Sequence, residues 1–258
     1  MMLTRRRTLG IGLAGLAGLG ATTVMPFRAP AQGADGEDYD TASGKITVSP
    51  ISLASFVMAV PAMVIYNDPV GGADLYKAHP APDLILITHE HGDHYDAETL
   101  TAIAGAGTRL ITNPAVFGML PDALQGKAAA IGNGEGTEAG AVKIEAIPAY
   151  NITQDRLKYH PKGRDNGYVL TVDGRRVYIA GDTEDIPEMR ALKEIDIAFV
   201  PMNLPFTMDV EQASSAVAEF APKFVYPYHY KGSDPLAFAA KVEAAGKEIE
   251  VVQGPWYA

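Results

Sequence analysis

An apolar run that leads directly into a histidine cluster is the feature that most restricts how this 258-residue chain can fold. Residues 83–88, Asp-Leu-Ile-Leu-Ile-Thr, are almost continuously apolar, which is typical of a strand buried on both faces of a sheet. His89, His91, Asp93 and His94 follow at once. The sequence therefore predicts a buried strand whose carboxyl end carries imidazole and carboxylate groups, at the edge where sites form in α/β proteins.

The spacing of these side chains predicts a metal site. His89 and His91 lie two residues apart, so an extended backbone directs both rings to one side. Gly92 permits a tight turn that would return Asp93 and His94 to the same centre. Imidazole and carboxylate suit one or two Zn²⁺ ions, with Mn²⁺ or Fe as alternatives, and the chain has no cysteine to offer thiolate. The competing interpretation is a solvated polar loop after a strand.

The remainder of the chain alternates short apolar strands with helical stretches and contains no linker, so we expect one domain over residues 44–258. The dipeptide Asp173-Gly174 predicts a hairpin. Residues 32–43, rich in Gly, Asp and Glu, are expected to be a flexible lead-in, and 132–140 a turn-rich loop. The other expected strands are 46–48, 55–58, 63–66, 109–112, 142–147, 168–172, 176–180, 195–200, 224–228 and 249–252, and the expected helices are 96–104, 115–124, 210–220 and 235–245.

The amino-terminal 31 residues have the features of an export signal. The basic run Arg5-Arg6-Arg7 precedes an apolar Gly/Ala/Leu-rich stretch, and Ala29-Pro30-Ala31 provides a small-x-small cleavage site. The arginine pair resembles a twin-arginine signal. We therefore expect a periplasmic or otherwise exported protein without stable membrane insertion once the signal is removed. An uncleaved membrane anchor is the alternative.

Charge and composition indicate which classes of substrate and partner the protein can bind. The chain is 47% hydrophobic and carries a formal net charge of -10, so it is a globular, acidic protein. An acidic body lacks the basic surface that binds phosphate backbones, which argues against nucleic acid and favours a small-molecule substrate. The absence of cysteine excludes disulfides and a cysteine nucleophile. The oligomeric state stays open.

The pattern His89-x-His91-x-Asp93-His94 resembles the signature of the metallo-β-lactamase superfamily of hydrolases. Three further segments match the family in its order along the chain: Asn67-Asp68-Pro69, Gly181-Asp182-Thr183 and Tyr226-Pro227-Tyr228-His229. The resemblance implies an α/β protein with a four-layer α/β/β/α sandwich and a two-metal site on one edge. Carried over, His89 and His91 would bind one metal, Asp93, His94 and His229 the other, with Asp182 between them and Asp68 supporting the metal loop.

One ligand that the family expects is missing. The place of a histidine reads Ala149-Tyr150-Asn151, and Asn151 offers only a weak amide oxygen. His160, within His160-Pro161-Lys162-Gly163, could take that place or act as general acid. This combination resembles a branch of the superfamily similar to the ascorbate-phosphate lactonases and the N-acyl-phosphatidylethanolamine phospholipases.

The predicted activity is metal-dependent hydrolysis of a small ester, lactone, amide or phosphodiester. Bound metal would lower the pKa of a water towards 7 and so provide hydroxide, with Asp93 as proton acceptor and His160 or a second water as proton donor. Tyr150, Asn151 and Lys162 are expected to contact the substrate. The alternative is a non-catalytic metal- or ligand-binding protein of the same fold, which the departure at Tyr150-Asn151 supports.

Overall fold

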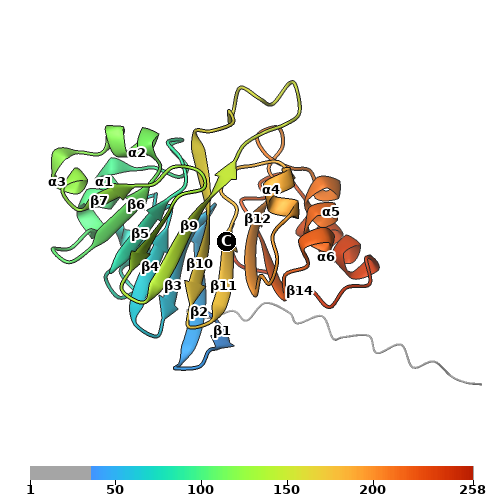
Figure 1. Cartoon of the computed structure of the whole chain (residues 1–258), viewed down its shortest axis with the longest axis horizontal. Helices are drawn as coiled ribbons and strands as arrows, with labels where there is room; N and C mark the ends of the chain where they lie inside the picture. The colour runs from blue at the N-terminus through green and yellow to red at the C-terminus, as the bar shows by residue number, and fades with distance from the viewer. Residues whose placement is uncertain (1–35, 258) are drawn as a thin grey trace, which may run out of the picture.

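The computed structural model describes residues 36–257, which form two seven-stranded sheets packed face to face (Figure 1). The predicted export signal lies outside the described residues. The first sheet contains β1 (Glu37–Asp40), β2 (Lys45–Ser52), β3 (Ser55–Val60), β4 (Met63–Asn67), β5 (Leu84–Ile87), β6 (Arg109–Thr112) and β7 (Ala128–Ala130). The second contains β8 (Gly136–Ala139), β9 (Val142–Ala149), β10 (Asp165–Val172), β11 (Arg175–Ile179), β12 (Ile197–Pro201), β13 (Phe224–Tyr228) and β14 (Glu250–Val251).

Both sheets have the same topology. Strands β1 to β4 form an antiparallel meander, and β4 to β7 run parallel. Strands β8 to β11 are likewise antiparallel, and β11 to β14 run parallel. Each half of the chain therefore begins as hairpins and ends as crossover units, and the carboxyl ends of its parallel strands share one edge.

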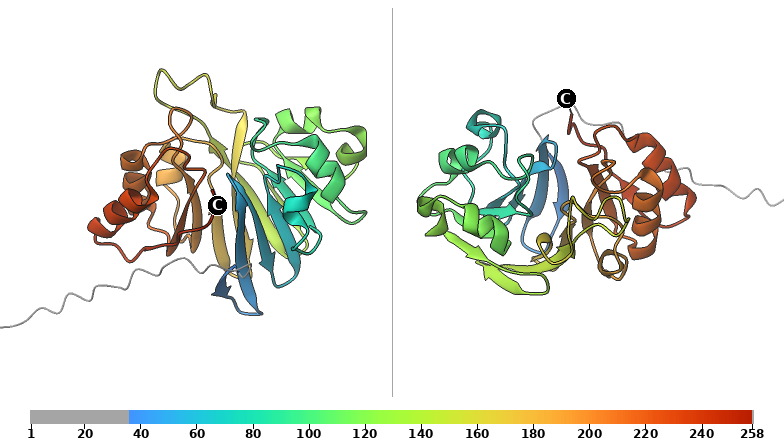
Figure 2. Two further views of the ribbon diagram at one scale, coloured as in Figure 1. Left: turned by 180° about the vertical axis from the view of Figure 1, so that it is seen from behind. Right: turned by 90° about the horizontal axis from the view of Figure 1, so that it is seen from above.

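Helices cover the outer face of each sheet, which gives four layers (Figure 2). The helices beside the first sheet are η1 (Ala73–Tyr76), α1 (Ala97–Ile103), α2 (Pro114–Met119) and α3 (Asp122–Gln125); those beside the second are α4 (Pro187–Arg190), α5 (Val210–Phe220) and α6 (Pro235–Ala244). One apolar cluster fills the space between the sheets, and two others lie beneath the two helical layers. The predicted α/β/β/α sandwich is confirmed.

Local sequence explains several elements directly. All four residues of β5 are buried because both faces of this strand are covered, as its continuous apolar run predicts. Helix α5 begins with a capping box in which Asp209 and Gln212 satisfy each other's backbone amides. Asp173 and Gly174 both have positive φ, 48° and 82°, as the two-residue hairpin turn between β10 and β11 requires.

The edge strands differ from the expectations. The predicted flexible lead-in contains β1, which pairs with β2 and is tied to it by Asp38, the acceptor for Lys45 Nζ at 3.0 Å and Thr47 Oγ1 at 2.6 Å. The predicted loop 132–140 contains β8, and β7 was not expected. These three strands lack a run of β-branched or aromatic residues, and their pairing depends on backbone hydrogen bonds to a neighbour. Among the described residues, no helix has the length and apolar character needed to cross a membrane.

Candidate metal centre

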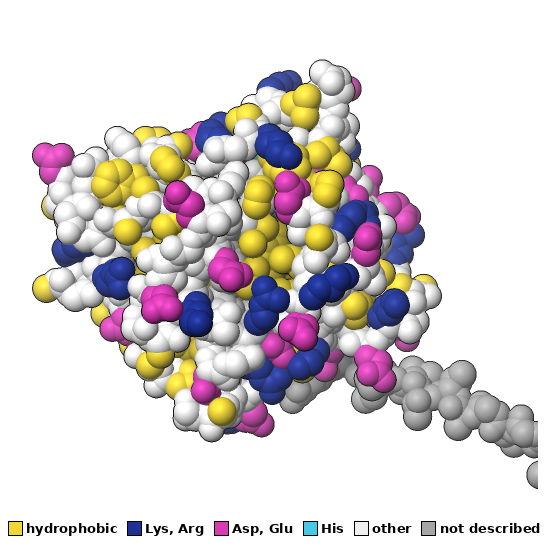
Figure 3. All heavy atoms as spheres, in the orientation of Figure 1, with side chains coloured by type: hydrophobic (Ala, Val, Ile, Leu, Met, Phe, Trp, Pro, Cys, Tyr) yellow, Lys and Arg dark blue, Asp and Glu magenta, His cyan; other side chains and the backbone are white. Residues whose placement is uncertain are grey.

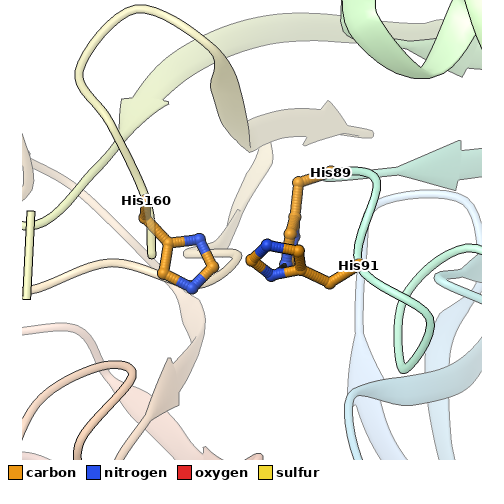
Figure 4. Close-up of side chains that lie close together, drawn as sticks. All are labelled: His89, His91 and His160. Carbon is orange, nitrogen blue, oxygen red and sulfur yellow. Dashed lines mark hydrogen bonds between the residues drawn. The ribbon is translucent and has the colours of Figure 1, made fainter. Parts of the chain in front are cut away.

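The predicted ligands meet at the edge where the parallel strands of both sheets end. The histidine motif follows β5, Asp182 follows β11 and His229 follows β13. His160 comes from the long loop between β9 and β10, and its ring faces the rings of His89 and His91 (Figure 4). Side chains separated by up to 140 residues thus lie in one cluster: His89, His91, Asp93, His94, His160, Asp182 and His229.

The first group of donors consists of His89, His91 and His160, whose ligand atoms all lie within 4.8 Å of one another. His89 Nε2 is 3.1 Å from His91 Nδ1, and the ring of His160 lies 4.9 Å and 4.8 Å from those of His89 and His91. His160 therefore places a third imidazole beside this pair, where the sequence offers only the amide of Asn151. Three imidazoles form a strong donor set for a divalent cation.

Asp93, His94 and His229 form a second group, and Asp182 lies between the two groups. His229 Nε2 is 3.2 Å from Asp93 Oδ2. Asp182 Oδ1 is 3.3 Å from His94 Nε2, while its Oδ2 is 3.5 Å from His160 Nε2 and 3.4 Å from His229 Nε2. One carboxylate thus faces histidines of both groups, as the predicted bridging role requires.

Buried partners fix the orientation of the rings. Asp68 Oδ2 lies 2.8 Å from His94 Nδ1, Asp165 Oδ2 lies 3.0 Å from His160 Nδ1, and Thr88 Oγ1 lies 3.0 Å from His89 Nδ1. Engaging Nδ1 leaves Nε2 of each ring for the centre. The support from Asp68 was predicted. Asp165 was missed, although an acidic residue shortly after His160 was a visible signal.

Four buried side-chain atoms of the site lack a hydrogen-bond partner, which bears on whether the site suits a cation. Nε2 of His94, His160 and His229 and Oδ1 of Asp182 are buried and make no hydrogen bond. Buried polar atoms normally have a hydrogen-bond partner, and these four lie among donor groups whose ligand atoms are within 4.8 Å of one another, where a bound cation would satisfy them. Nitrogen and carboxylate donors without thiolate fit a divalent metal. The residues present therefore suit the metal that the sequence predicts.

The histidines of the cluster differ in the direction in which their surroundings shift the pKa. Burial holds the pKa of His89 well below its usual value, and His94 adds to this effect. Burial also opposes the charged form of His229, but Asp182 and Asp93 outweigh it and raise the pKa of His229 to about 9. His94 behaves similarly: burial lowers its pKa, and Asp182 and Asp68 raise it well above the ordinary value. Protons thus occupy His94 and His229 at neutral pH when no metal competes.

Residues around the site adopt left-handed backbone conformations. Gly181 has φ +65°, and a Cβ there would lie 2.7 Å from Asn166 O, so only glycine allows the chain to enter Asp182. His229 itself has φ 45°, an uncommon conformation for a non-glycine residue. Gly92 differs from the expectation: its φ is not positive, and a Cβ would have open space around it. The turn that brings Asp93 and His94 to the site does not need glycine.

The loop that carries His160 is anchored by a buried carboxylate. Glu184 accepts hydrogen bonds from the amides of Ile152 and Thr153, each at 2.6 Å, and from Arg156 Nη1 at 2.6 Å. Arg156 also donates to Thr207 O and to Gln212 Oε1. Glu184 follows Asp182 by two residues, so the same turn holds the bridging carboxylate and the His160 loop.

The three predicted substrate contacts have partners within the fold. Tyr150 Oη donates to Glu188 Oε2 at 2.9 Å and accepts from Lys162 Nζ at 3.1 Å, and Lys162 also faces the Tyr150 ring. Asn151 Nδ2 donates to the carbonyls of Arg156 and Phe206. Asn151 therefore joins two loops of the site, and Lys162 shares its charge with Glu188. Their substrate contacts stay predictions.

Comparison with known proteins decides the family. A domain described as "Beta-lactamase superfamily domain" matches residues 47–229 and so covers most of the chain. The chain belongs to the metallo-β-lactamase superfamily. The matched region contains every residue of the cluster, from His89 to His229, and also Asp68.

Relatives narrow this membership to the UPF0173 metal-dependent hydrolases. One from Pyrococcus abyssi is 34% identical over 160 residues, which cover 60% of this chain and 69% of that protein. A solved structure described as a metal-dependent hydrolase from Parabacteroides distasonis is 44% identical, covers 85% of this chain and 97% of its own, and has a TM-score of 0.76. A metallo hydrolase from Ignicoccus hospitalis is 26% identical, with a TM-score of 0.66 over 81% of this chain and 95% of its own. This superfamily member is a metal-dependent hydrolase, as predicted. The likeness to the lactonase and phospholipase branch stays a prediction.

Proposed function

We propose that this protein hydrolyses a small ester, lactone, amide or phosphodiester at a site for two cations. His89, His91 and His160 would hold one cation, Asp93, His94 and His229 the other, and Asp182 would face both. The observation that carries the proposal is the set of buried nitrogen and carboxylate donors that group within 4.8 Å of one another, four of which have no hydrogen-bond partner. Zn²⁺ suits these donors, with Mn²⁺ or Fe as alternatives.

Cations bound there would polarise a carbonyl or phosphoryl oxygen and make water a stronger nucleophile at neutral pH. The chain's own residues prepare the site for this. Asp68, Asp165 and Thr88 hold three rings in fixed orientations. Asp93 is the accessible carboxylate of the cluster, with 44% of its side chain exposed, so it can exchange a proton with substrate or solvent.

We assign His160 to the metal rather than to proton donation. The side chain is 1% exposed, its Nδ1 is engaged by Asp165, and its Nε2 faces Asp182. A leaving group cannot readily reach a ring in this position. The position of His160 also counts against the non-catalytic alternative, because its imidazole lies beside His89 and His91, where Asn151 would offer only an amide oxygen.

Metal content measured together with turnover tests the proposal. Wild-type protein loaded with Zn²⁺ should hold two cations per chain and hydrolyse members of an ester, lactone and phosphodiester panel. His160→Ala should lose one cation and roughly 100-fold or more of the turnover. His79→Ala is the matched control, because His79 is partly exposed and is not among the grouped donors. Two cations and unchanged rates in His160→Ala would overturn the assignment, and a metal-loaded protein inert on the whole panel would favour the binding-protein alternative.

We also propose export of the folded, metal-loaded protein and a small-molecule substrate rather than nucleic acid. The arginine run and apolar stretch before residue 31 support the first, and the net charge of -10 supports the second. Fractionation of cells that produce the full chain tests the localisation. Replacement of Arg5 and Arg6 by Lys should leave the protein in the cytoplasm, whereas unchanged fractionation would contradict twin-arginine export.

A further inference from the structure

Exposed apolar side chains gather beside the candidate metal centre. Eight large hydrophobic residues of the described chain are exposed, and four of them fall on the loop between β9 and β10 and the loop between β12 and α5: Ile152 (48%), Leu157 (39%), Leu204 (44%) and Phe206 (41%). We call these four residues the apolar rim. The other four are dispersed over η1, α2, α6 and the carboxyl-terminal segment. Figure 3 shows hydrophobic side chains at the upper edge of the molecule, where the projecting loop of Figure 1 lies.

Direct contacts join the apolar rim to the cluster. The amide of Asn151, next to Ile152, donates to His160 O at 2.8 Å, and Asn151 Nδ2 donates to Phe206 O at 2.7 Å. Asn203, next to Leu204, has its Nδ2 3.5 Å from His229 Nδ1. The first loop therefore carries His160 itself, and the second approaches the ring of His229 through Asn203, so both loops that carry the apolar rim adjoin the donor groups.

The apolar rim is preformed rather than loose. Glu184 and Arg156 anchor the first loop to the turn after β11 and to Thr207 of the second. The rings of Tyr159 and Phe206 meet edge to face at 4.9 Å between the loops. Exposure of apolar side chains on loops so firmly held is unfavourable in water, and such patches mark binding surfaces. Because the loops are already ordered, binding of a ligand here would cost little free energy for ordering the protein.

The charges near the apolar rim indicate which kind of ligand it suits. The segment 151–164 has four basic residues and one acidic residue, in a chain whose net charge is -10. Arg156 and Arg164 are paired within the fold with Glu184, Glu90 and Asp165. The remaining charges beside the apolar rim are Lys158, Lys162 and Asp155, and Lys162 lies 3.5 Å from Glu188. These charges largely cancel, so the surface suits an uncharged apolar chain better than a strongly charged group.

We infer that the apolar rim binds the acyl chain of the substrate, so that the hydrolysed bond of an acyl ester, lactone or amide lies over the metal centre. The inference rests on the proposed function, because continuity with the cluster is what identifies the occupant as the substrate. Each methylene that leaves water against the rim should improve kcat/KM by roughly twofold to fourfold. Selectivity for longer acyl chains is the expected consequence.

A chain-length series tests this inference. With Zn²⁺-loaded protein, kcat/KM for p-nitrophenyl esters should rise from acetate to octanoate. In Ile152→Ser/Phe206→Ser the octanoate-to-acetate ratio should fall by about tenfold or more, because several methylenes lose their contact. Leu236→Ser removes an apolar side chain on α6 that is still more exposed, at 57%, and should leave the ratio unchanged. A flat series in wild type, or the same ratio in the double variant, would overturn the inference while the hydrolase assignment stands.

A binding measurement separates failure of the inference from failure of the proposed function. Decanoate should bind the Zn²⁺-loaded wild type and the Leu236→Ser variant, and about tenfold more weakly the double variant, whether or not esters are turned over. Equal decanoate affinity in all three proteins would overturn the inference. Two other results would also overturn it by naming a different occupant: a dimer that only the rim variant dissociates in light scattering, or sedimentation with phosphatidylglycerol vesicles that only the rim variant loses.

Discussion

Asp68 offers the sharpest test of how the fold prepares the metal centre, because it touches both the backbone and a ligand. Its Oδ1 accepts from the amide of Thr88 at 2.7 Å, and its Oδ2 lies 2.7 Å from Thr88 Oγ1 and 2.8 Å from His94 Nδ1. The side chain is fully buried, and φ is 41°. Asp68→Ala therefore removes three buried interactions and places alanine in a left-handed conformation.

The expected loss can be worked out from these contacts. Each buried donor left without an acceptor costs about 1–3 kcal/mol, and the left-handed alanine adds about 1 kcal/mol. Allowing for water entering the gap, we expect a total of roughly 3–5 kcal/mol. In a domain of this size such a loss lowers Tm by about 6–20 °C. The His94 ring, no longer held, should bind Zn²⁺ about 10- to 100-fold more weakly.

Two measurements and a second variant decide the outcome. Differential scanning calorimetry of metal-free protein gives Tm, and titration against a competing chelator gives the Zn²⁺ affinity. Asp68→Asn keeps the shape and tolerates the backbone conformation, so it should retain most of the stability and still lose about tenfold in affinity. Asp68→Ala with wild-type Tm and wild-type affinity would refute the reasoning, because Asp68 would then support neither Thr88 nor His94.

Three further predictions concern protons, backbone and loop anchoring. The fold raises the pKa of His229 to about 9 and that of His94 well above 6.5, so both protonated rings stabilise the metal-free protein. This contribution to the free energy of unfolding is complete below about pH 6.5 and is lost as the pH rises through the pKa values of the folded protein. Titration calorimetry at pH 7 in buffers of different ionisation enthalpy should accordingly detect about two protons released on Zn²⁺ loading, and none released would contradict the shifts. Gly181→Ala should lower the unfolding free energy by more than about 2 kcal/mol, whereas Gly92→Ala should leave it within about 0.5 kcal/mol in urea denaturation. Arg164→Gln should weaken Zn²⁺ binding about tenfold, because the guanidinium joins Glu90 of the histidine-motif loop at 2.8 Å to Asp165, the partner of His160, at 2.6 Å. Arg164→Lys should recover only part of the affinity. Unchanged affinity in Arg164→Gln would show that the loops are held without this side chain.

The central elements could be predicted because their local sequence and their environment agree. A strand covered on both faces needs an unbroken apolar run, and Leu84–Ile87 has one. The hairpin between β10 and β11 needs positive φ at both turn residues, and Asp173-Gly174 satisfies it. The edge strands β1, β7 and β8 escaped prediction because backbone pairing to one neighbour, rather than their own side chains, defines them.

The site could be predicted most directly where its residues are delivered by strands, whereas the sequence leaves two possible roles for His160. His89, His91, Asp182 and His229 sit at strand ends, whose position in a sheet follows from the order of the strands. His160 sits in a long loop, and its place depends on Glu184 and other contacts that no local pattern encodes. Asp165 follows His160 closely in the sequence, but its contact with that ring depends on how the loop returns to β10.

The repeated topology of the two sheets explains why the centre needs the whole domain. Asp68 follows the fourth strand of the first sheet, and Asp182 follows the fourth strand of the second, so both carboxylates occupy the corresponding place in each half. Their surroundings separate their roles: Asp68 is enclosed by Thr88 and His94, whereas Asp182 faces rings from both halves. His89 and His91 come from one sheet and His160 and His229 from the other half of the chain, so neither half contains a complete donor group of histidines. Cation binding is therefore coupled to the packing of one sheet against the other, and the apolar core between the sheets holds the donors in place.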